Sequence, residues 1–295
     1  MSVTTLPEET RSARLRDGRR LAYAEFGDPA GRPAFYFHGF PGSRKEGALI
    51  DRPAAAHGVR VIAIDRPGYG GSDPCPGRSL LDWADDVSDL ADALAVERFL
   101  VIGASGGGPY VAACARRLAD RIAGAGILCG MGPTDDPSLA RDMMALYRVG
   151  LRVARRVPSI ARPVFAVVGP AIRARPEFFV RRIAAGATAP DRAFFQDPEC
   201  TELFLATFRE AFRRGAGGAV RDGQLYARPW GFRLEDIPAT VHLWHGELDN
   251  VVPVAFGRHV ASRIPDCRAT FFPDEGHFSI ATRRAEEIVA AFDPD

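Results

Sequence analysis

A serine flanked by glycines follows an apolar segment of the chain and precedes a helical pattern. Residues 99–102 are apolar, Gly103, Ser105 and Gly107 have the spacing Gly-x-Ser-x-Gly, and residues 109–118 are typical of a helix. A serine at such a strand-to-helix turn has a strained backbone that raises its hydroxyl above the edge of the sheet. A phosphate-binding turn is the alternative, but neither GxGxxG nor GK[ST] occurs here. We therefore expect Ser105 to be a nucleophile.

A serine hydroxyl is a weak nucleophile until a base removes its proton, so a histidine must lie near it. Of the six histidines, His277 lies between the last expected strand and the final helix, where a loop can place an imidazole over the sheet edge. His245 opens the loop after the preceding strand and is the weaker candidate, and His38 is expected to structure a loop. The other three are expected to be ordinary surface or core residues: His57, His242 and His259.

The base needs a carboxylate that fixes its tautomer and stabilises the imidazolium formed during attack. Asp249 follows an expected strand at the same end of the sheet as the serine turn. The order Ser105, Asp249, His277 along the chain is typical of serine enzymes built on such a turn. Glu247 precedes this position by two residues, and Asp135, after the strand that ends near residue 128, is the alternative acid.

Negative charge that develops on a substrate oxygen needs donors already aimed at it, and removal of one such donor costs roughly 3 kcal/mol. The backbone N–H groups of Gly106 and Phe40 are the expected pair. Phe40 lies in the segment His-Gly-Phe-Pro-Gly-Ser, residues 38–43, which directly follows an apolar strand pattern. That is where a second donor should lie.

The elements that must position these residues alternate in type along the chain. An expected hairpin pairs residues 14–16 with 21–26 across an Asp-Gly turn. Amphipathic helical patterns, such as residues 80–94, then separate short apolar runs. These runs are residues 34–37, 59–64, 99–102, 122–128, 240–244 and 269–272. The alternation predicts an α/β protein with a doubly wound, mostly parallel sheet.

The alternation stops between residues 128 and 240, where the patterns are helical only and are interrupted by prolines. We expect an inserted helical cap of residues 131–235 on a core of residues 1–130 and 236–295. The cap holds nine of the 19 phenylalanines and 17 arginines against 11 acidic residues. Phe204, Phe208 and Phe212 share one helix face by their spacing. They are candidates for substrate binding, with the interior of the cap as the alternative.

Composition excludes several classes of function. The 38 basic and 37 acidic side chains nearly cancel, which disfavours nucleic acid as a partner. No run approaches the roughly 18 apolar residues of a membrane span, so a cytoplasmic protein is expected. The five cysteines are widely spaced, and no histidine lies in an HxxH or HExxH pattern. Neither a disulfide framework nor a metal site is therefore expected.

Together these features resemble the α/β-hydrolase family. The resemblance extends from the first hairpin to the last helix and includes the loop of residues 38–43, the segment Asp-Arg-Pro-Gly-Tyr-Gly-Gly-Ser at residues 65–72, the serine turn, Asp249 and His277. It implies an eight-stranded sheet under a helical lid, a substrate pocket between lid and sheet, and no metal. The cap matches no subfamily.

Serine at position 105 disfavours the family's dehalogenases and epoxide hydrolases, which use an aspartate there. Phe40 and the arginine-rich cap disfavour a proline iminopeptidase, which would show HGGPG and acidic groups in the cap. Hydrolysis of a carboxylic ester of a small to medium apolar molecule, through an acyl-enzyme and without a cofactor, is therefore expected. Carbon–carbon bond hydrolysis and lactone opening are alternatives, and a ligand-binding sensor with slow turnover is an alternative of another class. The oligomeric state is left open.

Overall fold

The computed structural model describes residues 10–294. One eight-stranded sheet has the order β1-β2-β4-β3-β5-β6-β7-β8. Only the pairs β1–β2 and β2–β4 are antiparallel. The strands are β1 (Arg11–Arg14), β2 (Arg20–Gly27), β3 (Arg32–Phe37), β4 (Val59–Ile64), β5 (Phe99–Ala104), β6 (Ile122–Leu128), β7 (Val241–Gly246) and β8 (Cys267–Phe272). The expected mostly parallel sheet of eight strands is confirmed.

The first strand begins and ends earlier than the sequence pattern suggested. It covers Arg11–Arg14 rather than residues 14–16, because the turn starts at Leu15. The Leu15 N–H donates to the Arg19 carbonyl at 2.8 Å, and the Gly18 N–H donates to the Leu15 carbonyl at 2.9 Å. The Asp-Gly pair is therefore part of a longer loop than the expected two-residue turn.

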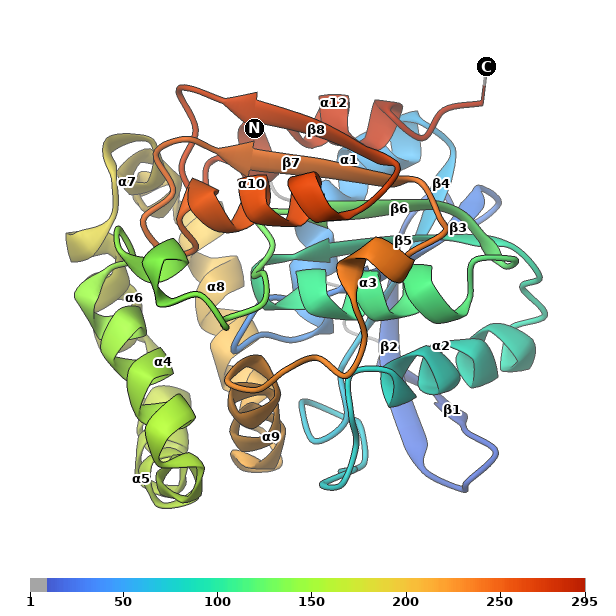
Figure 1. Cartoon of the computed structure of the whole chain (residues 1–295). Helices are drawn as coiled ribbons and strands as arrows, with labels where there is room; N and C mark the ends of the chain where they lie inside the picture. The colour runs from blue at the N-terminus through green and yellow to red at the C-terminus, as the bar shows by residue number, and fades with distance from the viewer. Residues whose placement is uncertain (1–9, 295) are drawn as a thin grey trace.

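Helices cover both faces of the sheet (Figure 1). One apolar core lies under α2 (Asp82–Ala93), α3 (Gly108–Arg117) and α10 (Val254–Arg263). The other lies under η1 (Arg44–Ile50), α1 (Asp51–Ala56), α11 (Ile280–Arg283) and α12 (Ala285–Ala290). Alternate residues of β3 pack in the two cores. Phe35 and Phe37 lie in the first core, and Ala34 and Tyr36 lie in the second. A strand buried on both faces must be apolar throughout, which explains the continuous apolar runs.

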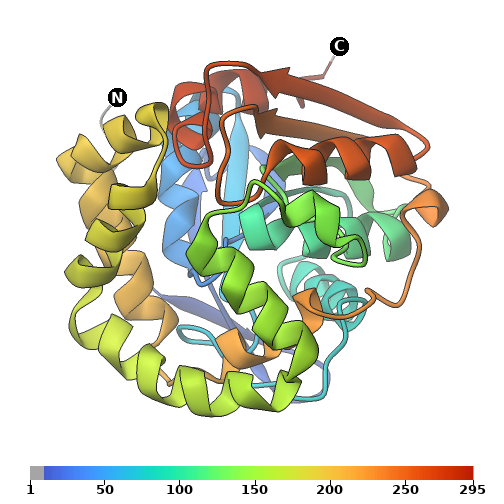
Figure 2. The same cartoon turned by 60° about the vertical axis from the view of Figure 1, so that its left-hand side comes forward.

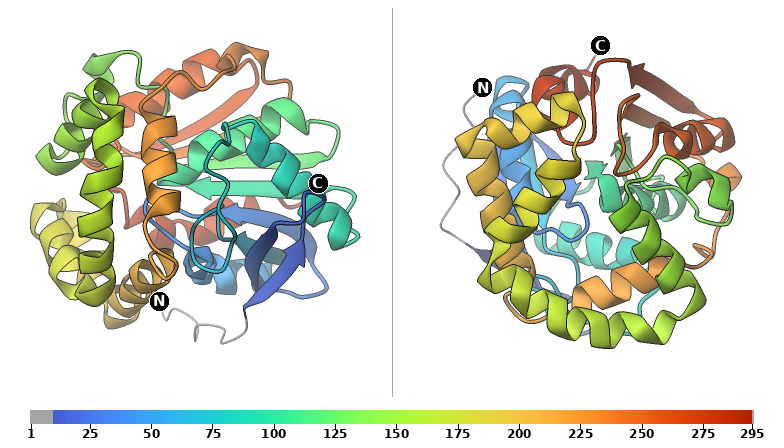
Figure 3. Two further views of the ribbon diagram at one scale, coloured as in Figure 1. Left: turned by 90° about the horizontal axis from the view of Figure 1, so that it is seen from below. Right: turned by 90° about the vertical axis from the view of Figure 1, so that its left-hand side faces the viewer.

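Between β6 and β7 the chain is helical apart from its connecting loops, and these helices pack across one end of the sheet (Figures 2 and 3). They are η3 (Pro137–Ala140), α4 (Ala145–Arg156), η4 (Pro158–Ile160), α5 (Ala161–Ala174), α6 (Pro176–Gly186), α7 (Ala189–Gln196), α8 (Pro198–Ala211), α9 (Gly217–Tyr226) and η5 (Leu234–Asp236). We call this segment the cap. Its exact division from the core at residues 131 and 235 stays a prediction. Within residues 10–294, every helix is too short or too polar to cross a bilayer.

The turn that carries Ser105 connects β5 to α3 through the short helix η2 (Ser105–Gly107). Ser105 has φ of 53°, the left-handed region that non-glycine residues rarely adopt. Its neighbour Gly107 packs against β3, and a Cβ placed on Gly107 would lie 2.2 Å from the Phe37 carbonyl oxygen. The absence of a side chain at Gly107 therefore allows the turn to approach β3 and hold Ser105 at the sheet edge.

This close approach predicts the effect of one methyl group. Gly107→Ala should lower the free energy of unfolding by about 3 kcal/mol, because the Phe37 backbone must move to relieve the overlap. Urea denaturation measures the change. Gly77→Ala is the matched control, since a Cβ there meets nothing within 4 Å. Equal stability of the two variants would contradict the close-approach explanation.

Candidate active site

A cavity of about 390 Å³ lies between the sheet and the cap. Ser105 and His277 both line it, although they are far apart in the sequence. Most of the other lining side chains are apolar, and most of these come from the cap. A predominantly apolar cavity with a few polar groups is the usual form of a small-molecule site.

His277 and Asp249 are paired by a hydrogen bond. The Nδ1 atom of His277 lies 2.7 Å from Oδ2 of Asp249. Oδ1 of Asp249 accepts the N–H groups of Val251 and Val252, both at 2.8 Å. These bonds fix the carboxylate, which in turn fixes the imidazole ring and leaves its Nε2 for the reaction. The alternative acid, Asp135, is exposed.

His245 lies near the same carboxylate oxygen as His277. Its Nε2 lies 2.8 Å from the Val252 carbonyl oxygen and 3.3 Å from Oδ2 of Asp249, and its side chain is fully buried. His245 is not among the residues that line the cavity. The geometry therefore favours His277 over His245 as a base that can reach substrate.

Carboxylates around His277 set its charge state. Burial alone would lower the pKa of His277, but the Asp249 charge and hydrogen bond, together with Asp191 and Glu46, raise it above its ordinary value. Burial would likewise raise the pKa of Asp249, but His277 and His245 hold it well below the usual range. The site thus favours an imidazolium, the state that forms when the base takes the serine proton.

Asp191 is an acid that the sequence gave no reason to select. It lies in α7 of the cap and is fully buried. Its carboxylate accepts the N–H of His277 at 2.9 Å, of Phe278 at 2.8 Å and of Ser279 at 2.9 Å. A cap residue therefore fixes the backbone of the loop that carries the candidate base. No local pattern around Asp191 could have revealed this contact across 86 residues of chain.

Glu46 is another such acid. It lines the cavity, and its Oε2 accepts the Gly39 N–H at 2.7 Å. Burial raises the pKa of Glu46 to about 7 against the opposing effects of the Gly39 hydrogen bond, Arg66 and His277. Near neutral pH this carboxyl group is therefore partly protonated. Its closeness to the 38–43 loop in sequence was the only available signal.

The two expected oxyanion donors belong to adjacent backbone segments. Phe40 and Gly106 both line the cavity, and a Cβ on Gly106 would lie 3.2 Å from the Phe40 nitrogen. The carbonyl of the Gly39–Phe40 peptide accepts from Nη2 of Arg66 at 2.9 Å. The carbonyl of the Ser105–Gly106 peptide accepts from the Met131 N–H at 3.0 Å. Because a trans peptide points its N–H opposite its C=O, these bonds fix the direction of both donors.

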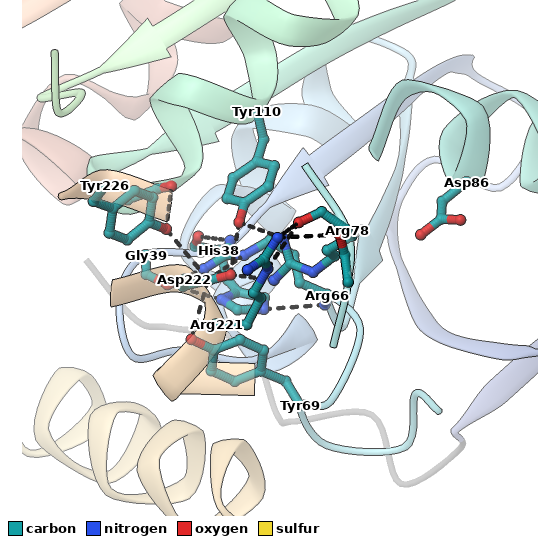
Figure 4. Close-up of polar contacts among 12 residues, drawn as sticks. His38, Gly39, Arg66, Tyr69, Arg78, Asp86, Tyr110, Arg221, Asp222 and Tyr226 are labelled. Atoms are coloured by element: carbon teal, nitrogen blue, oxygen red, sulfur yellow. Dashed lines mark hydrogen bonds and ion pairs between the residues drawn. The ribbon is translucent and has the colours of Figure 1, made fainter. Parts of the chain in front are cut away.

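Arg66 is held by a buried charge cluster behind this loop, and Asp222 from α9 lies at its centre (Figure 4). Nε of Arg66 donates to Asp222 at 2.9 Å, and Arg78 also pairs with it. The charges of these two arginines hold the pKa of Asp222 well below its usual range, although burial opposes them. Three tyrosine hydroxyls also lie within hydrogen-bond distance of Asp222: those of Tyr69, Tyr110 and Tyr226.

The three phenylalanines proposed from their helical spacing lie in two different environments. Phe204 and Phe208 line the cavity, whereas Phe212 does not. Phe212 is buried in the cap, where a Cβ on Gly169 would lie 3.1 Å from its ring. Each four-residue step rotates a helical position by about 40°, so a position eight residues on lies about 80° away. We therefore correct the expectation for Phe212, which is a residue of the cap interior.

Within residues 10–294, one group of three potential metal ligands has its donor atoms within 4.8 Å of one another: Cys129, His245 and Asp249. These residues suit a cation poorly. Burial raises the pKa of the Cys129 thiol well above its ordinary value, so the thiolate ligand is disfavoured. Both oxygens of Asp249 already have hydrogen-bond partners.

Comparison with known proteins identifies the family of this chain. The model of the "Alpha/beta hydrolase family" matches residues 34–291. The chain belongs to this family. It is 31% identical over 278 residues to the "Bifunctional esterase/perhydrolase DCH" of Acinetobacter calcoaceticus, covering 92% of this chain and 94% of the relative. The chain is 36% identical over 147 residues to a "Non-heme chloroperoxidase" of Streptomyces lividans, covering 47% of this chain and about half, 53%, of that relative.

The fold of the chain is shared with solved structures at lower identity. "The crystal structure of a hydrolase from Pseudomonas aeruginosa PA01" superposes with a TM-score of 0.70 at 19% identity and covers 97% of this chain and 98% of that one. Such a distant likeness establishes the fold alone.

The carboxylates around His277 predict how ester hydrolysis by this chain should depend on pH. A base works when neutral, so kcat/KM for a neutral ester should rise with pH along a limb centred above the ordinary histidine value of about 6.5. Glu46→Gln removes a negative charge that favours the imidazolium, so the limb should move to lower pH. The profile of the Glu46→Gln variant should also be described by a single ionisation better than the wild-type profile is, because Glu46 itself titrates near 7.

The matched control is Glu97→Gln, a change at an exposed carboxylate. Initial rates of acetate-ester hydrolysis across the pH range give both profiles. A limb that stays in place, or moves to higher pH, in Glu46→Gln would contradict this account of the electrostatics.

Proposed function

We propose that the protein hydrolyses carboxylic esters through an acyl-enzyme formed on Ser105. One observation carries the proposal: Ser105, held at positive φ at the sheet edge, shares an apolar cavity with His277, whose other ring nitrogen is bound to buried Asp249. A strained serine that shares a cavity with an oriented base suits the role of an acyl-transfer nucleophile. The Acinetobacter relative is named as an esterase, which supports an ester as substrate.

In the proposed reaction the Ser105 oxygen attacks the ester carbonyl carbon while Nε2 of His277 takes its proton. The carbonyl oxygen becomes an oxyanion that the N–H groups of Phe40 and Gly106 stabilise. Collapse breaks the bond to the alcohol, which leaves with the proton from His277. Water then attacks the acyl carbon by the same route, with His277 as base, and releases the carboxylic acid and free Ser105.

The cavity supports a substrate with an apolar acyl or alcohol group. Phe204 and Phe208 from α8 and Phe165 from α5 contribute to its wall. We propose that the cap of residues 131–235 selects the substrate through these side chains. The charged and titratable side chains along the wall include Glu46, Arg182 and His277.

The roles of Ser105 and His277 predict non-additive losses. Ser105→Ala and His277→Ala should each reduce kcat for a p-nitrophenyl ester by roughly 10⁴-fold or more, and the double variant should be little worse than either. Exposed Ser262→Ala is the matched control and should keep full activity. If the fold-losses in kcat of the two single variants multiplied in the double variant, Ser105 and His277 would not act together as nucleophile and base.

The positions of the phenylalanines predict two different effects. Phe204→Ala and Phe208→Ala should each remove about 1–3 kcal/mol of transition-state binding for octanoyl and benzoyl esters and leave acetyl esters nearly unchanged. Phe212→Ala should lower the free energy of unfolding by about 3–5 kcal/mol without changing the preference among esters. Measurement of kcat/KM for the three esters, with a denaturation curve for each variant, separates the two. Uniform losses in all three variants would contradict the proposed pocket wall.

A further inference from the structure

The cap helices α4 and α5 each have two apolar faces. On α4, Tyr147, Leu151 and Ala154 line the cavity. A second apolar face of α4 is exposed and consists of Leu146, which also reaches the cavity, Val149, Val153 and, just beyond the helix, Val157. An ordinary surface helix has one apolar stripe, which packs on the protein. The second stripe therefore needs an explanation outside the core.

The same arrangement continues on α5. Its inner side contributes Phe165, Val168 and Ile172 to the cavity, while Val164 and Val167 point outward. Ile160 lies at the junction with α4. Together the seven outward side chains, from Leu146 to Val167, are 37–74% exposed. In Figures 2 and 3 α4 and α5 form the outer edge of the cap, on the side away from β8. We call these seven side chains the outer apolar stripe.

Positive charge surrounds the outer apolar stripe. Residues 145–182 contain nine arginines and one acidic residue, Glu177, which pairs with Arg209. Among the described residues, none of the nine arginines forms an ion pair with a carboxylate. Eight of them are exposed: Arg152, Arg155, Arg156, Arg162, Arg173, Arg175, Arg181 and Arg182. An apolar stripe flanked by unpaired arginines has the composition of a helix that lies on an anionic membrane surface.

The charge also argues against a second copy of this chain as the occupant. A symmetric dimer brings the same surface of both subunits together, so it would place these arginines opposite one another. Like charges at an interface cost several kcal/mol. An anionic lipid surface supplies the opposite charge and an apolar layer at once.

We propose that α4 and α5 dock the protein on an anionic lipid surface, with the outer apolar stripe in contact with the acyl chains and the arginines in contact with phosphate groups. Leu146 connects this surface to the cavity, because it lines the cavity and is 65% exposed. An apolar ester could pass from the membrane into the cavity along it. That last step depends on the proposed esterase function, whereas docking does not.

Sedimentation with lipid vesicles tests the docking. The full chain carrying Ser105→Ala, in which hydrolysis cannot alter the lipid, should sediment with vesicles of phosphatidylcholine plus phosphatidylglycerol and remain in solution with phosphatidylcholine alone. Binding should weaken steeply with salt. Val153→Glu combined with Val167→Glu should lower the partition coefficient at least tenfold. Arg152→Ala combined with Arg156→Ala should lower it roughly tenfold or more, from the usual contribution of a basic side chain near the surface.

Matched controls lie elsewhere on the surface. Leu248→Glu changes an exposed apolar residue outside the cap, and Arg98→Ala removes an exposed arginine outside it. Both should bind vesicles like the parent. No sedimentation at low salt, or equal losses in the controls, would overturn the proposal. If light scattering showed a dimer that dissociates in the Val153→Glu variant, the proposal would be overturned in favour of self-association.

Activity assays separate this proposal from the proposed function. With active protein, Val153→Glu combined with Val167→Glu should leave hydrolysis of a water-soluble acetate ester unchanged, because neither side chain lines the cavity. It should slow hydrolysis of a long-chain ester presented in anionic vesicles at least tenfold. If the wild-type protein bound vesicles but hydrolysed no ester, the proposed function would be contradicted and the docking proposal would stand. Equal rates of the variant and wild-type proteins on the vesicle substrate would overturn the role of docking in substrate access.

Discussion

The buried pairing of Asp222 with Arg66 and Arg78 is the constraint on which the site depends. All three side chains are almost completely buried, so the arginine charges require a carboxylate close by. Arg66 also donates to the carbonyls of His38 and Gly39, which fixes the loop that carries Phe40. Since Asp222 comes from the cap, the cap helps to hold the loop of residues 38–43 in place. Removal of Asp222 would leave two buried cations behind this loop.

Two further carboxylates join the cap to the core. Asp191 of α7 binds the backbone of the His277 loop. Glu210 of α8 pairs with Arg44 at 2.6 Å, and Arg44 pairs in turn with buried Asp65. The helices α7, α8 and α9 thus each contribute one carboxylate to the core. They form a fixed part of the site, because moving them away from the core would leave these carboxylates, and the arginines that pair with two of them, without their partners.

The helices α4 and α5 contain no acidic residue and have no such anchor. They contact the rest of the cap through the apolar residues around the cavity. Charge is therefore divided within the cap: Asp191, Glu210 and Asp222 of α7–α9 bind the core, whereas eight of the nine arginines within residues 145–182 are exposed. The sequence shows that the cap is rich in arginine, and the fold shows which helices carry these exposed arginines.

The sequence by itself determined the sheet, the helical insertion and the residues whose side chains could take part in a reaction. The continuous apolar runs of the strands and the glycine spacing around Ser105 are local signals, because each depends on a few neighbouring residues, whereas Asp249 and His277 are indicated by their order along the chain. The limits of β1 were misjudged because the Leu15–Arg19 loop is fixed by backbone hydrogen bonds rather than by residue type. Strand ends are therefore less predictable than strand identity.

Only the tertiary structure decided which distant groups meet. Asp191, Glu46, Arg66 and Asp222 act across long stretches of chain, and the residues around each carry no pattern that names its partner. Phe204, Phe208 and Phe212 look equivalent in sequence, yet helix rotation places only the first two at the cavity. The outward direction of the apolar stripe on α4 and α5 likewise depends on how the helices pack. Periodicity shows which side chains share a face, and packing alone sets what that face meets.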